Sequence, residues 1–465
     1  AQRHDCGQRG PRACSRRIRF CQSGKLKHSV SRGACPPVDD ASKAQQVGFT
    51  VLTSCAFLLP LSMTTLTQTD TPWRDDVAVI GLVGLAHASS HFSHLLLPLM
   101  FPVFMKTFGL SYSELGFLMS VFFVVSGMGQ ASAGFVVDRF GARPVMYGSL
   151  LVLSLACVVA SFAESYTGLM LAAAMLGVGN CSFHPVDFTI LNQRVSAPRL
   201  GYAFSAHGLT GNLGWAVAPV FMVSLSTMFD WRVAYLGAGV AFLSILLLLV
   251  WQRDALLTHV VDHQQAADGT HTLAFMKIPV VWWCFGFFFL STMTLAVVQS
   301  FSVSILQAMY SVTFEAATMT LTAYMLCAAA GMFVGGFVAA RWPRQSDKVV
   351  AVCMTVAAIF MALCGSGLFD AMTTMVILAA TGLAIGVGGP SRDMMIKKAT
   401  PKGATGRVYG MVYSGLDVGF AVSPVIFGVF MDHGWYGATL LGAAIVLLLS
   451  VLVALGVGRR TVQPV

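Results

Sequence analysis

Twelve stretches of about 20 apolar residues, separated by short polar loops, constrain this chain more than any other feature, because a helix of that length crosses a bilayer. The predicted spans of the first half are 77–105, 114–137, 144–163, 166–192, 201–226 and 232–252. A polar segment, 253–277, separates them from the second set. The predicted spans of the second half are 278–307, 313–339, 348–369, 372–396, 407–431 and 436–457.

The composition supports a membrane class. Of 465 residues, 56% are hydrophobic and 11% are charged, and the mean hydropathy is +0.73. Soluble globular chains carry about 25% charged residues, so this chain has too few charges for a water-exposed surface. We therefore predict an all-α membrane protein with a six-helix bundle at 63–252, a cytoplasmic linker at 253–277 and a second six-helix bundle at 278–465.

The net charge of +9 lies mostly at one end of the chain. Residues 1–62 hold ten Lys/Arg and three Asp/Glu, whereas the remaining 403 residues hold nineteen and seventeen. The body of the chain therefore has no basic domain, and nucleic acid is not an expected partner. The same 62 residues contain five of the eleven cysteines and no methionine. We expect translation to start at Met63, with 1–62 an over-extended or processed leader outside the fold.

The positive charges predict the orientation. If both termini are cytoplasmic, sixteen loop Lys/Arg lie on that side, and only Lys106 and Arg232 lie outside. This bias indicates a multi-pass protein of a bacterial inner membrane with both termini inside.

The two halves repeat. The segment Gly134–Arg139 recurs at Gly336–Arg341, an offset of 202. The segment Asn212–Pro219 recurs as Asp417–Pro424, an offset of 205, and Pro185 matches Pro390 at the same offset. Parallel repeats of this kind are typical of transporters whose substrate site lies between the halves.

The loop between the second and third spans carries a charged motif formed by Gly134, Asp138, Arg139, Gly141 and Arg143. We expect Gly134 to let a neighbouring helix come close and Gly141 to allow a sharp turn. Asp138 can face a helix N-terminus or an arginine, while the two arginines stay in the headgroup zone. We interpret the motif as a conformational latch on the cytoplasmic side.

The spacing Gly-x-x-x-Asp-Arg-x-Gly-x-Arg resembles the loop signature of the major facilitator superfamily. With the twelve spans and the half repeat, the resemblance covers residues 75–460. It implies rocker-switch alternating access, in which the latch favours the outward-open state. The second copy departs from the signature, with Ala340 in place of the acid and Pro343 in place of the glycine, so a latch there should be weaker.

Three segments are similar to the fosmidomycin-resistance branch of efflux proteins: 85–87, 177–185 and 211–214. The glycine-rich fifth span, with Ala218 and Pro219, is also similar to the antiporter motif of drug exporters. The resemblance implies export, but these short matches fix no substrate.

Ionisable residues at bilayer depth are costly and by default indicate a substrate or proton path. They form two stripes at helical spacing, one on the first span (His87, His91 and His94) and one on the fourth (Asn180, His184 and Asp187). We expect both to face a central cavity and Asp187 to be the best single proton acceptor. The alternative is that the histidines only form hydrogen bonds between helices. A zinc site from the three histidines of the first span is geometrically possible, but no metal is assigned.

Further polar candidates lie on other spans. Asn212 and its counterpart Asp417 hold an amide in one half and an acid in the other. Arg392 could pair with Asp393 or contact an anionic substrate, and Gln299 is a candidate hydrogen-bonding group in the cavity. His207 shares a face with small residues of the fifth span, which favours helix packing.

The chain has no phosphate-binding Gly-Lys-Ser/Thr loop, so it has no ATPase of its own and must use an ion gradient or act as a uniporter. The leading hypothesis is a monomeric proton-driven exporter, an antiporter, of small organic compounds. The expected partners are a small-molecule substrate, protons and the lipid bilayer, with no cofactor. The alternative is proton-coupled uptake of a small organic anion. A membrane-embedded enzyme would need a longer loop or an appended domain, so we expect no enzymatic activity.

Overall fold

The computed structural model describes residues 72–258, 277–399 and 405–461, all within one compact unit, Thr69–Val465. The described residues include 12 helical segments that are long and apolar enough to cross a membrane. The predicted all-α membrane fold is therefore confirmed. The predicted leader, 1–62, lies outside the described residues.

The helix bounds agree with the predicted spans to within a few residues at most ends. The first half contains α2 (Trp73–Leu95), η1 (Pro98–Met100), α3 (Phe101–Phe108), α4 (Tyr112–Phe140), α5 (Ala142–Ser161), α6 (Tyr166–Asn180), α7 (Phe183–Arg194), η2 (Ala197–Arg199), α8 (Leu200–Met228) and α9 (Trp231–Trp251). The second half contains α10 (Pro279–Tyr310), α11 (Phe314–Arg341), η5 (Pro343–Gln345), α12 (Ser346–Gly365), α13 (Ala371–Ala399), α14 (Thr405–Asp432) and α15 (Tyr436–Thr461).

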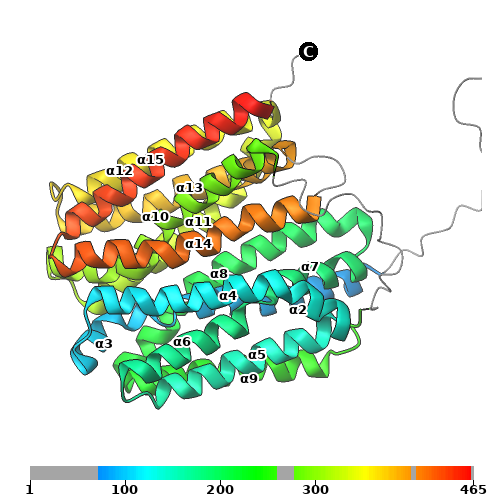
Figure 1. Cartoon of the computed structure of the whole chain (residues 1–465), viewed down its shortest axis with the longest axis horizontal. Helices are drawn as coiled ribbons and strands as arrows, with labels where there is room; N and C mark the ends of the chain where they lie inside the picture. Colours follow the sequence, from blue (N-terminus) through cyan, green and yellow to red (C-terminus); the bar gives the residue numbers. More distant parts are fainter. Residues whose placement is uncertain (1–71, 259–276, 400–404, 462–465) are drawn as a thin grey trace, which may run out of the picture. The chain divides into compact units, whose positions relative to one another are not determined.

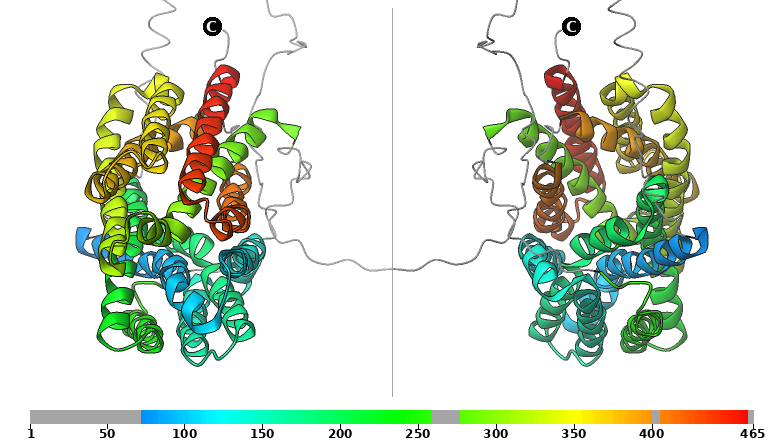
Figure 2. Two further views of the ribbon diagram at one scale, coloured as in Figure 1. Left: turned by 90° about the vertical axis from the view of Figure 1, so that its left-hand side faces the viewer. Right: turned by 90° about the vertical axis from the view of Figure 1, so that its right-hand side faces the viewer.

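The helices form two six-helix bundles. Figures 1 and 2 show the blue-to-green helices of the first half on one side and the light-green-to-red helices of the second half on the other. The bundles meet along two seams, in which α4 packs against α14 and α8 packs against α11. Because the sequence repeat relates α4 to α11 and α8 to α14, the two seams are pseudo-symmetric. The exact domain boundaries around the linker 253–277 remain a prediction, since most of this segment lies outside the described residues.

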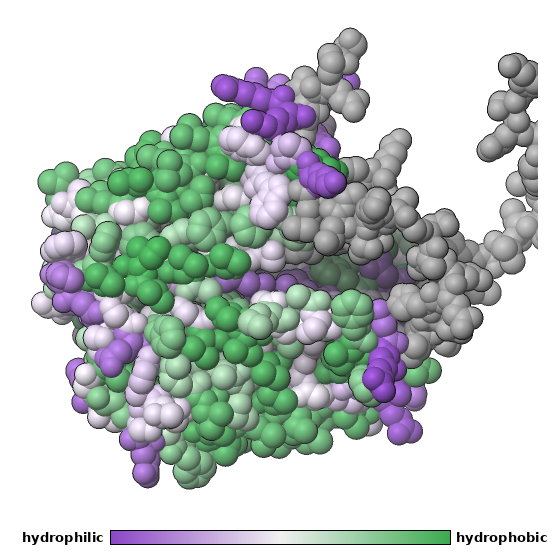
Figure 3. Space-filling view, viewed as in Figure 1, coloured by the Kyte–Doolittle hydropathy of each residue, from purple (hydrophilic) through white to green (hydrophobic). Residues whose placement is uncertain are grey.

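The surface suits a bilayer. Figure 3 shows hydrophobic residues over the middle of the molecule and hydrophilic residues toward its two ends. Large apolar side chains such as Phe135, Leu247 and Leu452 are 61–78% exposed, which would be unfavourable in water but is expected for helices that face lipid.

One end of the α4–α14 seam is held by polar contacts. Asp432, the last residue of α14, accepts hydrogen bonds from the backbone N–H groups of Tyr112 at 2.6 Å and Ser113 at 3.0 Å, both in the first turn of α4. The Ser113 hydroxyl also donates to Asp432, at 2.5 Å. A carboxylate at a helix N-terminus satisfies free N–H groups and is favoured by the helix dipole. We call this the far end, because Arg139 and the latch lie at the opposite, basic end of α4.

Close helix packing continues from the far end toward the middle of the seam. A side chain at Gly116 would place its Cβ 2.3 Å from the backbone oxygen of Pro424, and the Ser120 hydroxyl donates to the backbone oxygen of Ala421. At the basic end, the position that a Cβ of Gly134 would occupy has nothing within 4 Å. The prediction that Gly134 accommodates a close helix is therefore wrong for this structure, because that position faces open space. Figure 3 shows a hollow between the bundles beside the basic end.

Candidate functional site

The polar residues of the first bundle lie on two spans whose helices are interrupted. The first span breaks at residues 96–100, between α2 and α3, and the fourth breaks at 181–182, between α6 and α7. Pro98 lies in the first break, and Pro185 lies in the first turn of α7, where its missing N–H costs no helical hydrogen bond. In transporters, interrupted helices commonly form substrate and ion sites.

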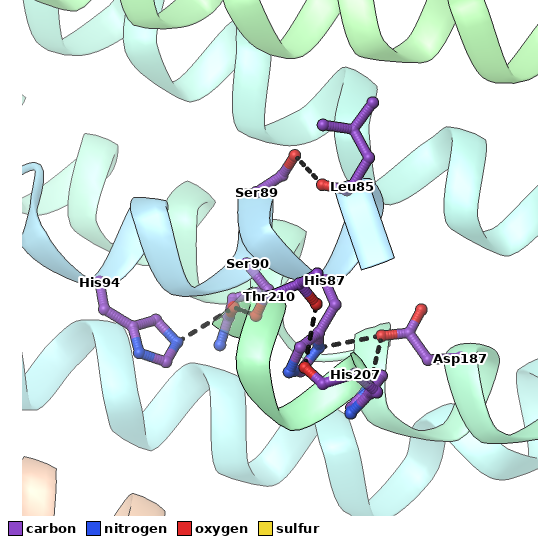
Figure 4. A network of polar contacts seen from close by, with 9 residues as sticks. Leu85, His87, Ser89, Ser90, His94, Asp187, His207 and Thr210 are labelled. Carbon is purple, nitrogen blue, oxygen red and sulfur yellow. Dashed lines mark hydrogen bonds and ion pairs between the residues drawn. The ribbon is translucent and has the colours of Figure 1, made fainter. Parts of the chain in front are cut away.

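A buried carboxylate, that of Asp187 on α7, lies between two histidines (Figure 4). Its Oδ2 accepts hydrogen bonds from His87 Nδ1 on α2 at 3.0 Å and from His207 Nε2 on α8 at 3.1 Å. The rings of His87 and His207 stack with their centroids 3.5 Å apart. Asp187 has 0% of its surface exposed. These three residues, which we call the His–Asp cluster, join three helices through one carboxylate oxygen, and burial of a charge needs such partners.

Two further histidines border the His–Asp cluster. The ring of His91 lies 4.6 Å from that of His87, and the ring of His184 lies 5.3 Å from it, centroid to centroid. Both are partly exposed, whereas His87 is buried. Four imidazoles and one carboxylate thus gather where α2, α7 and α8 meet.

His94 belongs to a second network, which His91 joins to the first: the ring of His91 lies 5.2 Å from that of His94 and 4.2 Å from that of Trp215, centroid to centroid. Its Nε2 donates to Asn180 Oδ1 at 3.3 Å, and Trp215 Nε1 donates to its Nδ1, also at 3.3 Å. These two contacts require the neutral imidazole with its proton on Nε2. Asn180 Oδ1 also accepts from the Ser90 hydroxyl at 2.6 Å, and its Nδ2 donates to Ser126 at 2.9 Å. We call these five residues the His94 network.

Glycines on α8 bring the helices close enough for these contacts. A Cβ at Gly214 would lie 2.2 Å from the backbone oxygen of Ala88, so only glycine allows this approach of α8 to α2. A Cβ at Gly211 would lie 2.7 Å from His91 Cε1 and 3.1 Å from His87 Nε2. The small-residue face of α8 therefore packs as predicted, and it also makes room for the histidine rings.

Asn212 and Asp417, which the repeat relates, each lie at one of the two seams. Asn212 on α8 donates to the sulfur of Met332 on α11 at 3.0 Å. Asp417 on α14 accepts from Gln130 Nε2 on α4 at 3.3 Å. Gln130 and Met332 are separated by the repeat offset of 202, so the two contacts are pseudo-symmetric. One seam holds an amide and a thioether, and the other holds an acid and an amide.

The remaining candidates of the second bundle lie apart from the His–Asp cluster. Arg392 Nε donates to Asp393 Oδ1 at 3.0 Å, and its guanidinium lies over the ring of Phe288, 5.0 Å from the centroid. Of the two interpretations of Arg392, the structure therefore contains the first, in which the arginine pairs with Asp393. Gln299 on α10 is 4% exposed, and its Nε2 has no hydrogen-bond partner among the described residues.

The latch residues lie at the basic end. Gly141 follows α4 with φ of 84°, a conformation that favours glycine and gives the sharp turn into α5. Asp138 and Arg139 lie in the last turn of α4. Arg143 Nη1 donates to the backbone oxygen of Arg253, two residues after the end of α9, at 3.1 Å.

The predicted stripes thus divide between two places. His87, His91, His184 and Asp187 gather at one, and His94 and Asn180 at the other. The alternative interpretation was that the histidines form hydrogen bonds between helices, and both places contain such bonds. The predictions assigned His207 to helix packing, although a further histidine at bilayer depth also signals a polar site. They did not include Ser90, Ser126, Trp215 or Gln130.

Comparison with known proteins identifies the family. A model of the Major Facilitator Superfamily matches residues 83–345 and 287–464, which is most of the chain. The chain belongs to this superfamily. The solved structure of a bacterial homolog of the human lysosomal transporter Spinster, titled inward-facing and occupied, matches with a TM-score of 0.67 at 13% identity, covering 84% of this chain and 97% of that one.

Curated relatives are transporters of several kinds. A niacin transporter of Acinetobacter baylyi is 29% identical over 134 residues, which is 29% of this chain and 30% of the relative. A fosmidomycin resistance protein of Escherichia coli is 26% identical over 150 residues, covering 32% and 36%. A multidrug resistance protein B homolog of Mycobacterium tuberculosis is 27% identical over 192 residues, covering 40% and 36%. Each match spans about a third of the relative. The superfamily and the relatives named here are those of membrane transporters rather than enzymes.

Proposed function

We propose that the chain exports small organic compounds in exchange for protons, as a monomer that works by rocker-switch alternating access. The observation that carries the proposal is the contact of Asp417 with Gln130 across the α4–α14 seam. An ionisable group at bilayer depth is a default candidate for ion coupling. This one lies between the two bodies that must move relative to each other, so its protonation can be linked to their movement.

The geometry of the seam supports the link. Gln130 Nε2 stabilises the charged carboxylate of Asp417, and this contact crosses from one bundle to the other. The groups that face Asp417 from α4 are this amide and the backbone of Gly127, neither of which is charged. A proton on Asp417 would remove its charge and weaken the contact. We propose that this change favours separation of the bundles at that level.

The sidedness follows from the charges. We propose that the basic end is cytoplasmic, with both termini inside, in a bacterial inner membrane, because loop arginines and lysines are retained on that side. The contacts of Asp432 would then close the outer side, and the hollow beside the basic end would open inward. The latch motif would close this inner side in the opposite state.

We assign substrate contacts to the His94 network. His94 lies 6.0 Å from the ring of Phe420 on α14, and Phe123 on α4 stacks on Phe420 with centroids 4.4 Å apart. Imidazole, indole and phenyl groups from both bundles therefore meet next to the seam. Such a mixture of apolar rings and few polar groups suits a small organic compound.

A drug-susceptibility panel with a matched variant strain tests export. An exporter-deficient bacterium that expresses the chain should become less sensitive to at least some compounds in a susceptibility panel that includes fosmidomycin. A matched strain that expresses the Asp417→Asn variant at the same level should regain sensitivity. Unchanged sensitivity to every compound with the wild-type chain would contradict export.

A second candidate is proton-coupled uptake of a small organic anion. It is supported by Arg392, a cation at bilayer depth whose side chain is 29% exposed, and by relatives named for niacin, L-galactonate and sulfoacetate. Uptake of labelled niacin by whole cells, compared between wild type and Arg392→Gln, tests it. Accumulation that needs a proton gradient and a higher KM in the variant would favour uptake over export.

A further inference from the structure

We propose that the His–Asp cluster is a binding site for a divalent transition-metal ion, with His87, Asp187 and His207 as ligands and His91 and His184 as additional ligands. The ligand atoms of His87, Asp187 and His207 all lie within 4.8 Å of one another, and so do those of His87, His91 and His184. Both groups share His87. The two groups therefore adjoin each other at His87, and His87, Asp187 and His207 form the fully buried one of the two.

The spacing of the atoms fits a small ion. His87 Nδ1 and His207 Nε2 lie 3.0 and 3.1 Å from the same carboxylate oxygen. Around a tetrahedral zinc ion with bonds of about 2.0–2.1 Å, neighbouring ligand atoms lie about 3.3 Å apart. Side-chain shifts of a few tenths of an ångström would convert the hydrogen-bonded arrangement into a coordinated one.

Two buried atoms, one in the His–Asp cluster and one beside it, lack hydrogen-bond partners among the described residues. Asp187 Oδ1 and His91 Nδ1 form no hydrogen bond with any described residue. Asp187 is fully buried, and an unsatisfied buried carboxylate oxygen is costly. A cation that Asp187 binds through both carboxylate oxygens would supply the missing partner for Oδ1. If hydrogen bonds alone held the cluster, the lack of a partner for Asp187 Oδ1 would have no explanation.

The ligand chemistry indicates the class of ion. Imidazoles with one carboxylate suit Zn²⁺, Cu²⁺, Ni²⁺ and Fe²⁺, whereas Mg²⁺ and Ca²⁺ prefer sites of oxygen atoms. The sequence alone suggested His87, His91 and His94. The structure removes His94 from this set, because both of its ring nitrogens are engaged by Asn180 and Trp215.

The position within the fold indicates a resident ion rather than a transported one. All five residues belong to α2, α7 and α8 of the first bundle, so movement of one bundle against the other leaves the set intact. The ion would connect the interrupted fourth span to two neighbouring helices. We therefore expect it to stabilise the first bundle, which goes beyond the transport activity proposed above.

The test uses the purified full chain in detergent, stripped with a chelator and titrated with Zn²⁺ alone. We expect one ion per chain and a rise in the midpoint of thermal unfolding on binding. Asp187→Asn and His207→Ala should each lower the affinity more than about 100-fold, since even outer-shell partners are worth roughly 10–100-fold. The exposed His433→Ala should leave the affinity within about twofold of wild type, and His94→Ala, which removes no ligand, should lower the affinity less than His207→Ala does.

A spectroscopic measurement guards against misfolded variants. Co²⁺ in place of Zn²⁺ should give visible d–d absorption bands in the wild type that disappear in His207→Ala, provided that the variant elutes as a single species on size exclusion. Absence of stoichiometric Zn²⁺ binding to the wild-type chain would overturn the proposal. Equal loss of affinity in His94→Ala and His207→Ala would also overturn it, because the ligand set would then be wrong.

Discussion

The two bundles share a packing scheme but carry different chemistry. At the repeat offset of 205 that relates Pro185 to Pro390, Asp187 corresponds to Arg392, and His184 and His207 correspond to Gly389 and Val412. The fourth span is interrupted between α6 and α7, whereas its counterpart α13 continues through Pro390. The first bundle thus gathers buried ionisable groups beside a helix break, and the described residues of the second bundle show no such break at the corresponding place.

The close approaches of helices are retained in both bundles. Gly214 and Gly419 lie at the same offset, and a Cβ at either would press on a backbone oxygen, that of Ala88 at 2.2 Å and that of Phe289 at 2.7 Å. Backbone packing of this kind depends on the absence of a side chain, so a larger residue at either position would force the helices apart. The comparison teaches that the duplicated fold is preserved by its glycines, while the polar sites differ.

The largest expected effect comes from the acid at one seam. Asp417→Asn should lower proton-driven transport about 100-fold, the lower end of what a positioned proton-transfer group contributes. Exchange of labelled for unlabelled substrate without a proton gradient should continue, since binding and movement of the bundles remain. Both rates can be measured in reconstituted liposomes.

The double variant Asn212→Asp with Asp417→Asn moves the acid to the other seam, where it would meet Met332 rather than Gln130. Full recovery of driven transport in this variant would mean that the seams are equivalent, contrary to the comparison drawn here.

The retained glycines give the next largest effect, on stability. Gly214→Ala and Gly419→Ala should each lower the free energy of unfolding by about 2 kcal/mol, because overpacking of a tight contact typically costs 1–3 kcal/mol. The shorter contact predicts the greater loss for Gly214→Ala. Thermal unfolding in detergent measures both. Gly148→Ala is the matched control, since nothing lies within 4 Å of its Cβ position. Equal destabilisation by all three changes would contradict the packing argument.

A smaller effect is expected at the far end. Asp432→Asn removes the charge that caps α4 from the other bundle, an interaction worth about 1 kcal/mol or about fivefold in an equilibrium. The variant should therefore populate the state that is open at the far end about fivefold more. Thiol labelling of a single cysteine introduced at Ser120, which is buried at the same seam, reports this opening. If the cysteine is labelled at the same rate with and without the Asp432→Asn change, Asp432 has no gating role.

The smallest effect is expected at the other seam. Asn212→Ala removes a hydrogen bond to the sulfur of Met332, a weak acceptor, and should change transport by no more than about twofold. A loss as large as that of Asp417→Asn would show that both seams carry the coupling.

The sequence predicted the fold in detail because each span has a strong and local signal. Apolar length sets the helix bounds, and the recurrence of Gly134 at Gly336 indicates the duplication. For His87 and Asp187, the sequence predicted only that each lies in a polar stripe, one on the first span and one on the fourth. It did not predict that the two side chains contact each other. Their actual partners depend on how helices rotate against one another, which no local pattern specifies.

Two examples show where this limit lies. His207 shares its helix face with Gly211 and Gly214, and that face both packs and carries an ionisable group, so the packing interpretation concealed the second role. Gln130 lies 202 residues before Met332, yet an isolated amide in an apolar span gave no reason to pair it with Asp417. Contacts between spans far apart in sequence became visible only in three dimensions.

The central claim is that protonation of Asp417 sets the separation of the two bundles at the basic end. Spin labels at Phe135 and Phe337, both exposed and related by the repeat offset, allow the distance between bundles to be measured by electron–electron resonance in a variant that lacks other reactive cysteines. We predict a distance distribution that shifts between acidic and alkaline buffers in the chain with Asp417 and does not shift in Asp417→Asn. The same shift in both chains, or a shift in neither, would contradict the claim.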